Sequence, residues 1–349
     1  MERPAFTSTT MYGARFSDVA YWRPYVEEIC RRHDLPCGEV RGGVAGTFPV
    51  SIVDERHVVK LFGDLFEGRN TFAVEMEVYR LLHGRARIPL PTLLASGHLF
   101  TPDEPWSWPY TVTRFVPGES LGEADDRLTY RDRLAVAAYL GATLRDLHRV
   151  PLPPTGPLQR SWDGFLRYLM ARRAVCVADH KAWAGRPEGG LPPALIAQIE
   201  AYLPPVEDLV DRRTEPCLAH ADLNADHLLG EVDDGGWRTT ALIDFGDARA
   251  GDPAYELPAL HLGLFRCDKR LLRAFLAAYN WDYRPRAGFV RQAMSMTLLF
   301  PFGVGPLVRA FPAAAHVTSL DGLVACQHAI LALPVVRSAV VETALRRVG

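Results

Sequence analysis

Residues 220–230 read HADLNADHLLG, and residues 242–247 read LIDFGD. Each stretch places acidic side chains directly beside apolar ones of the kind that form buried strands. A carboxylate in such a place is costly unless a proton donor, a cationic side chain or a metal ion meets it. Three interpretations of the first stretch are open: a solvated turn, a metal site, or part of an enzyme active site.

The composition describes a globular chain without a strong electrostatic preference for a partner. The 349 residues are 48% hydrophobic and carry a formal net charge of −2, which suits two domains or one bilobal unit. There is no basic excess to attract nucleic acid or an anionic membrane. The opening residues lack the pattern of a signal peptide, and no long uncharged apolar run occurs. We expect a cytoplasmic monomer or weak dimer that binds neither nucleic acid nor membrane.

The predicted secondary structure changes near residue 115 from mainly strands to mainly helices. Before it, residues 48–53 and 57–62 are β-type runs joined by the turn DER, which predicts a hairpin, and residues 72–82 carry apolar side chains at helical spacing. After it, residues 129–150 have an amphipathic helical pattern. Further helices are expected at about 161–176, 193–203, 255–264, 268–279 and 286–300, with a second hairpin at about 227–245 inside this helical part.

A glycine-rich segment precedes the first hairpin. The sequence RGGVAG contains Gly42, Gly43 and Gly46. Because glycine has no Cβ, backbone amides in such a loop can approach phosphate oxygens closely. An ordinary hairpin turn is the alternative, since the G-x-G-x-x-G spacing is absent.

Lys60 lies between Val59 and Leu61 in the second strand of this hairpin. An ammonium in apolar surroundings is costly unless an anion meets it, and the alternative is a lysine on the solvent face of an edge strand. Either Glu75 or Glu77 on the following helix can supply the anion. Such an ion pair would hold Lys60 toward the α- and β-phosphates of a nucleotide.

Two aspartates flank the second hairpin. Asp222 lies two residues after His220, and a carboxylate there could orient or deprotonate a substrate hydroxyl above a buried, hydrogen-bonding histidine. Asp244 ends an apolar strand, where a metal ion is a suitable partner. A turn residue is the alternative for either aspartate alone. A lysine, a glutamate and two aspartates in this order favour a nucleotide-dependent enzyme.

The two quoted stretches closely resemble the catalytic and metal-binding loops of the aminoglycoside phosphotransferase family, whose fold is related to that of protein kinases. The resemblance covers most of the chain, and motifs such as VVKLFG, VEMEVYRLL and LGATLRDLHRVPL are most similar to hygromycin B phosphotransferases that modify the 7″-hydroxyl. It implies an α+β, protein-kinase-like fold of two lobes. Residues 1–115 would form a small, β-rich nucleotide-binding lobe, and residues 116–349 a larger, mainly helical lobe for catalysis and substrate.

The resemblance also implies a role for each motif residue. Asp222 would be the catalytic aspartate and Asp244 the principal Mg²⁺ ligand. Lys60 would contact the phosphates, with Glu75 as its partner of first choice and Glu77 as the second.

The nucleotide itself would meet backbone groups. Residues 110–118, YTVTRFVPG, resemble the hinge of the family. The carbonyl of Arg114 and the N–H of Val116 would then face the adenine edge, and the loop of Gly42, Gly43 and Gly46 would lie over the phosphates.

One position departs from the family. Five residues after the catalytic aspartate the family usually has asparagine, and this chain has His227. Imidazole is a poor replacement for an amide oxygen on Mg²⁺. Three accounts compete: Asn224 or Asp226 supplies the oxygen, Asp244 holds one metal with water, or His227 binds a softer ion such as Mn²⁺. Loss of catalysis is a fourth.

The resemblance implies transfer of the γ-phosphate of ATP, or of GTP, to a hydroxyl of a sugar-containing antibiotic, either an aminoglycoside or a nucleoside. A metabolic small-molecule kinase and a nucleotide-binding pseudokinase are the alternatives. Acidic residues that could meet substrate amines are Glu256, Asp268, Asp282 and Asp321. The apolar stretches at 294–308 and 323–336 would suit an antibiotic with few positive charges, or would simply pack in the core.

Overall fold

The computed structural model divides into two compact units. It describes residues 1–44, 46–101, 106–184, 190–280, 289–301 and 317–323. Unit 1 comprises residues 1–123, 226–231 and 238–247, and unit 2 comprises residues 124–225, 232–237 and 248–349. The second hairpin was expected inside the helical part, but most of its strand residues group with unit 1.

Unit 1 is built on a five-stranded sheet in the order β1-β2-β3-β5-β4. The strands are β1 (Val40–Gly42), β2 (Val50–Val53), β3 (His57–Leu61), β4 (Leu93–His98) and β5 (Pro109–Arg114). All neighbouring pairs are antiparallel. The predicted hairpin is present as β2 and β3, in which Val50 pairs with Lys60 and Val53 with His57.

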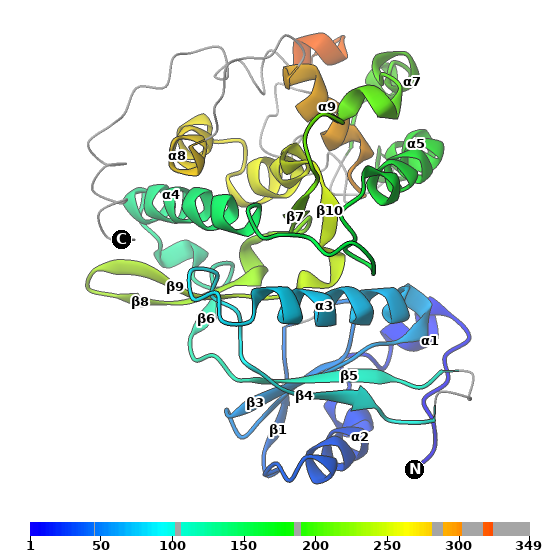
Figure 1. Ribbon diagram of the computed structural model, residues 1–349, viewed down its shortest axis with the longest axis vertical. Coiled ribbons are helices and arrows are strands. Elements are labelled where there is room, and N and C mark those ends of the chain that lie inside the picture. Colours follow the sequence, from blue (N-terminus) through cyan, green and yellow to red (C-terminus); the bar gives the residue numbers. More distant parts are fainter. Residues whose placement is uncertain (45, 102–105, 185–189, 281–288, 302–316, 324–349) are drawn as a thin grey trace. The chain divides into compact units, whose positions relative to one another are not determined.

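Helices cover both faces of this sheet. Figure 1 shows α3 (Gly68–Leu82) on one side and α2 (Val19–Arg32) on the other. Side chains alternate along β3, so Val59 and Leu61 pack into a fully buried core with Trp22 of α2. The same alternation turns Lys60 toward the opposite face, where Glu75 of α3 is one of its two partners.

Helix α2 and the short α1 (Thr9–Gly13) were not predicted from the sequence. Signals for α2 were nevertheless present. Asp18 caps it by accepting a hydrogen bond from the N–H of Tyr21, and Trp22, Val26 and Ile29 recur at helical spacing and are buried.

A second, three-stranded sheet has the order β6-β8-β9, from β6 (Glu119–Ser120), β8 (Leu228–Asp233) and β9 (Gly236–Leu242). Gly118, just before β6, has φ +110°, and a Cβ there would lie 2.1 Å from the carbonyl oxygen of Gly230. Only glycine satisfies both conditions. Beyond β9, the N–H of Ile243 donates to the carbonyl of His227 at 3.0 Å, which fixes the chain just before Asp244.

Unit 2 is mainly helical. Its longer helices are α4 (Tyr130–Leu147), α5 (Trp162–Ala184), α8 (Lys269–Tyr279) and α9 (Phe289–Leu299), and β7 (Cys217–Ala219) pairs antiparallel with β10 (Arg249–Gly251). Helices α4 and α8 pack closely at Gly141, where a Cβ would lie 2.3 Å from the carbonyl oxygen of Phe275. The mixed α and β architecture agrees with the predicted α+β class.

Some helix predictions for unit 2 were wrong in detail. Helix α5 runs past residue 176 to Ala184, and the helix expected at 193–203 is two short ones, α6 (Pro193–Ile196) and α7 (Ile199–Tyr202). The expected helix at 255–264 is a 3₁₀ turn followed by the π-helix Pro258–Leu264. Pro258 has no N–H to donate at this junction, which prevents a continuous α-helix.

Candidate active site

Lys60 forms the centre of an ionic cluster in unit 1. Its Nζ donates to Glu75 Oε2 at 2.7 Å and to Asp244 Oδ1 at 2.8 Å. Lys60 and Glu75 are largely buried, with side chains 13% and 7% exposed, whereas Asp244 is 43% exposed. The sequence had left Glu75 and Glu77 as alternative partners. Glu77 instead pairs with Arg80, at 2.6 Å.

The cluster fixes the charge of Lys60. Burial by itself would lower the pKa of this ammonium, but the carboxylates of Asp244 and Glu75 outweigh burial and raise it. For Glu75, burial is the largest effect and raises the pKa, although Lys60 opposes it. Lys60 is therefore a permanent cation with one carboxylate behind it and a second, more exposed one beside it.

Asp244 reaches this position through a strained turn. Its φ is +62°, a conformation that a short polar residue tolerates better than most. Two residues later, Gly246 packs so closely on α3 that a Cβ there would lie 2.5 Å from Thr71 Cγ2. The turn therefore rests on α3 beside the residues that hold Lys60.

The residues around Asp244 fit a cation shared with a nucleotide. Asp244 Oδ2 lies 3.5 Å from Nε2 of His227, which is 14% exposed. Across the part of the chain that the structure describes, no three His, Cys, Asp or Glu side chains group together as a metal site. Mg²⁺ commonly takes only one or two carboxylates from a protein and completes its shell with phosphates and water. Asp244 meets that minimal requirement.

The other two candidate metal ligands, Asp226 and Asn224, belong to different units of the structure. Asp226 belongs to unit 1 and is exposed, with Oδ1 close to Gly122, where a Cβ would lie 2.3 Å from it. Asn224 belongs to unit 2. His227 belongs to unit 1 with Asp244, and its imidazole lies beside that carboxylate.

The glycine loop follows β1 in unit 1. The N–H of Gly43 donates to the carbonyl of Val50 at 2.9 Å, and a Cβ on Gly43 would lie 2.6 Å from Val50 Cγ1. A Cβ on Gly46 would meet nothing within 4 Å. Local packing therefore requires glycine at 43 but not at 46. The start of the loop, Gly42, is exposed.

The expected hinge lies at the end of β5. Arg114 is exposed and its N–H donates to the carbonyl of Thr92 at 2.8 Å, so its amide is used within the sheet. Val116, two residues further, is half-buried. The predicted adenine contacts use the carbonyl of Arg114 and the N–H of Val116. The bond to Thr92 uses the N–H of Arg114, which is neither of these groups.

The loop that carries Asp222 belongs to unit 2, and a buried carboxylate binds its backbone. Glu256, 1% exposed, accepts hydrogen bonds from the backbone N–H groups of His220 and Ala221, at 2.7 and 3.1 Å. His220 is fully buried, as predicted, and its Nδ1 accepts from the N–H of Asp222 at 3.4 Å. Ala221 has φ +68°. Two carboxylate bonds thus hold a strained turn directly before the half-buried Asp222.

A histidine keeps Glu256 charged. Nε2 of His148 lies 3.2 Å from Glu256 Oε1, and Nδ1 lies 2.7 Å from the hydroxyl of Tyr279. Burial would raise the pKa of Glu256, but His148 and His220 more than offset burial and lower it. His148 and Tyr279 were not among the predicted site residues. An acid inside the apolar run AYELPAL was a signal that such partners must exist.

The four acids proposed for substrate amines have different outcomes. Glu256 is buried and binds the backbone of His220 and Ala221, so it is not a surface acid as the alternative interpretation held, and both its oxygens are already used within unit 2. Asp268 caps α8 by accepting from the N–H groups of Arg270 and Leu271. Asp321 is exposed. Asp282 lies outside the described residues, as do 302–308 and 324–336 of the two apolar stretches.

Comparison with known proteins places this geometry in a family. Residues 39–289, more than half of the chain, match the model of the phosphotransferase enzyme family, APH. The chain belongs to this family.

Solved structures show the same kinase-like fold. The GDP complex of aminoglycoside 2'-phosphotransferase-IIIa has a TM-score of 0.59 and 19% identity, covering 90% of this chain and 97% of that one. ADP-bound APH(2'')-Ib has a TM-score of 0.55 and 17% identity, covering 86% and 98%. A thermostable APH(4)-Ia mutant with ADP and hygromycin B has a TM-score of 0.50 and 19% identity, covering 85% and 97%.

A curated relative is considerably longer. Lysine-specific demethylase JMJ21 of Arabidopsis thaliana is 26% identical over 360 residues, covering 74% of this chain. The chain spans about 38% of the length of that protein. In the described part of the phosphotransferase chain, no helix is both long and apolar enough to cross a membrane.

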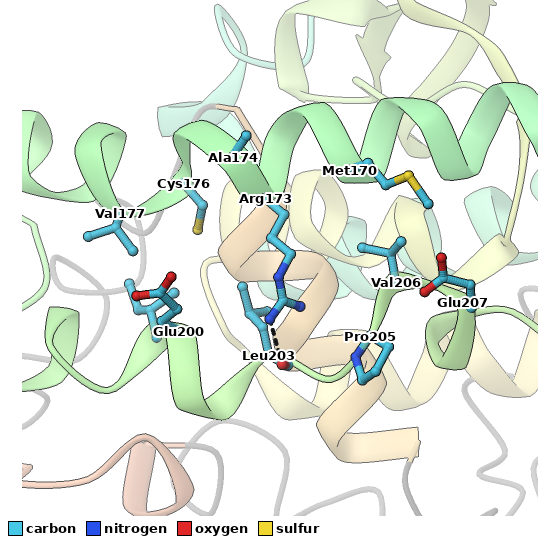
Figure 2. Close-up of a pocket in the computed structure, with 11 residues that line it drawn as sticks. Met170, Arg173, Ala174, Cys176, Val177, Glu200, Leu203, Pro205, Val206 and Glu207 are labelled. Atoms are coloured by element: carbon cyan, nitrogen blue, oxygen red, sulfur yellow. Dashed lines mark hydrogen bonds between the residues drawn. The ribbon is translucent and has the colours of Figure 1, made fainter.

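A separate cavity of about 520 Å³ lies in unit 2, between α5 and residues 199–207 (Figure 2). Met170 and Val177 of α5 face Leu203 and Val206 across it, and Arg173 donates to the carbonyl of Leu203 at 3.1 Å. Neither Asp222 nor Glu256 lines this cavity.

The Lys60 cluster predicts unequal effects for two glutamates on the same helix. Glu75→Ala removes one partner of a buried charge and should lower the free energy of unfolding by about 3 kcal/mol. Glu77→Ala breaks a pair with Arg80, whose side chain is 61% exposed, and should cost at most about 1 kcal/mol. Urea titrations followed by tryptophan fluorescence measure both. Equal losses would contradict the assignment of Glu75 as the buried partner.

Proposed function

We propose that this phosphotransferase moves the γ-phosphate of ATP, or of GTP, to a hydroxyl of a sugar-containing antibiotic such as an aminoglycoside or a nucleoside. The observation that carries the proposal is the buried Lys60 held between Glu75 and Asp244. The consequence for the cell would be antibiotic resistance or self-protection, and we expect the chain to work in the cytoplasm as a monomer or weak dimer.

The charge of the cluster supports a nucleotide accompanied by a cation. One ammonium and two carboxylates sum to a formal charge of −1, which would repel a polyphosphate. A divalent cation on Asp244 would reverse that sign and neutralise the phosphate oxygens. Lys60 would then contact the α- and β-phosphates, while Glu75 prevents it from swinging away. Gly42, Gly43 and Gly46 would cover the phosphates, and Arg114 and Val116 would bind the base.

Asp222 is proposed as the catalytic residue. The rigid support from Glu256 suits a carboxylate that must orient an acceptor hydroxyl and accept its proton. The loose transition state of phosphoryl transfer makes such positioning the main contribution of the protein.

The substrate prediction can be tested by product mass. Purified protein with Mg²⁺ and ATP or GTP should add one phosphate to at least one of hygromycin B, other aminoglycosides and nucleoside antibiotics. Asp222→Asn should lower the rate by about 10²–10⁴-fold, the range for loss of a general base. The exposed Asp234→Asn, in the hairpin turn, should leave the rate unchanged.

Each alternative function predicts a different result in this assay. Phosphorylation only of sugars, amino alcohols or amino acids would establish the metabolic kinase instead. Nucleotide binding without any transfer would establish the pseudokinase. Full turnover by Asp222→Asn would remove Asp222 from the catalytic role.

We further propose that His227 and Asp244 together hold the cation, so that Mn²⁺ binds at least as well as Mg²⁺. Their donor atoms lie 3.5 Å apart in the same unit. Imidazole nitrogen favours borderline ions over Mg²⁺.

The metal prediction concerns binding and does not depend on the acceptor. With ADP present, His227→Asn should shift the ratio of Mn²⁺ to Mg²⁺ affinity toward Mg²⁺ by at least about ten-fold. Bound Mn²⁺ should show nitrogen hyperfine coupling in pulsed electron paramagnetic resonance of the wild type but not of His227→Asn. Absence of that coupling in the wild type, with an unchanged ratio, would favour the oxygen-only accounts. Asp226→Asn serves as the control and should alter neither quantity.

A further inference from the structure

The N-terminal segment, residues 1–38, precedes the region that matches the family model. In unit 1 it folds as α1 and α2 against the sheet. Trp22 is 1% exposed and donates to the carbonyl of Arg15 at 2.8 Å, and Tyr25 donates to the carbonyl of Glu2 at 2.8 Å. The segment is therefore a packed part of unit 1.

Tyr12 connects this segment to the glycine loop. Its hydroxyl donates to the carbonyl of Thr47 at 2.8 Å. Tyr12 is 3% exposed, whereas Thr47 is exposed. The ring packs edge-on against Phe6 at 5.2 Å and lies so close to Gly63 that a Cβ there would be 3.2 Å from it. A rigid, buried donor thus holds an exposed stretch of backbone.

Other side chains of the segment lie under the start of the same loop. A Cβ on Gly42 would lie 3.5 Å from Val19 Cγ2. A cavity of about 60 Å³ separates Phe16, Val19 and Trp22 from the loop. Packing under the loop is therefore incomplete, and hydrogen bonds such as the one from the N–H of Gly43 to the carbonyl of Val50 restrain it. The bond from Tyr12 is such a restraint.

The held stretch of backbone continues into a side chain near Lys60, the proposed phosphate ligand. Thr47 is followed by Phe48, which is 7% exposed and packs against Phe62 at 5.3 Å. Nζ of Lys60 lies 5.9 Å from the centre of the Phe48 ring. A change at Thr47 would therefore be transmitted to the wall beside Lys60.

We propose that Tyr12 is a positioning residue that holds the glycine loop in the shape that accepts nucleotide phosphates. The inference rests on the proposed nucleotide-dependent function and adds a residue that lies outside the region matched to the family. Without the bond, the loop populates other conformations, and the apparent affinity for nucleotide falls in proportion to the competent fraction. Losing one ordinary hydrogen bond corresponds to about a five-fold change.

The test compares two tyrosines of the same unit. Tyr12→Phe and Tyr25→Phe each remove one hydroxyl that donates to a backbone carbonyl at 2.8 Å, but only Tyr12 contacts the loop. We expect Tyr12→Phe to speed hydrogen exchange of the amides of Gly46, Thr47 and Phe48 in the free protein. It should also raise the Kd for ATP, or for GTP, about five-fold by calorimetry. Tyr25→Phe should change neither quantity.

Loop exchange in Tyr12→Phe that matches the wild type would overturn the proposal. So would an unchanged or lower Kd for nucleotide, or equal effects of the two variants, which would indicate general destabilisation. Melting temperatures of both variants provide the stability control. If the wild type binds neither ATP nor GTP, the proposed function fails, and the exchange data still decide whether Tyr12 holds the loop.

Discussion

A buried ammonium that requires anions is the constraint on which the rest of unit 1 depends. Lys60 cannot remain charged beside Val59 and Leu61 unless carboxylates meet it on the other face of the sheet. Glu75 supplies one from α3, and Asp244 supplies the other from a segment 184 residues further along the chain. A single cation thus joins a strand, a helix and a distant turn.

The distant turn is placed by several unusual backbone features. Asp244 has a positive φ, Gly246 allows close contact with α3, and Gly118 allows the approach of Gly230. Such positions are costly, and proteins keep them where a functional side chain needs a particular direction. The loop of Asp222 in unit 2 follows the same principle, since Ala221 has a positive φ and Glu256 accepts hydrogen bonds from the consecutive N–H groups of His220 and Ala221.

The first hairpin could be predicted from local periodicity, and the pairing of Lys60 with a glutamate from the cost of a buried charge. The fold class came from the resemblance of the two loop motifs to a known family. Residue chemistry alone left Glu75 and Glu77 open, since that choice depends on the orientation of α3, and the family resemblance made Glu75, the residue that pairs with Lys60, the first choice. Sequence reasoning also missed His148, because the contact of His148 with Glu256 spans 108 positions. Helix α2 had recognisable signals, but the strand-rich segments around it were given more weight.

The proposed function requires Lys60 to contact the phosphates of the nucleotide. The difference between the affinities for ATP and for adenosine measures this contact most directly. Lys60→Met keeps the length of the side chain and removes its charge. With the same divalent cation present, the wild type should bind ATP more tightly than adenosine, and Lys60→Met should lose at least about ten-fold in ATP affinity while binding adenosine normally. Normal adenosine binding shows that unit 1 is folded. Undiminished ATP affinity in Lys60→Met would contradict the account.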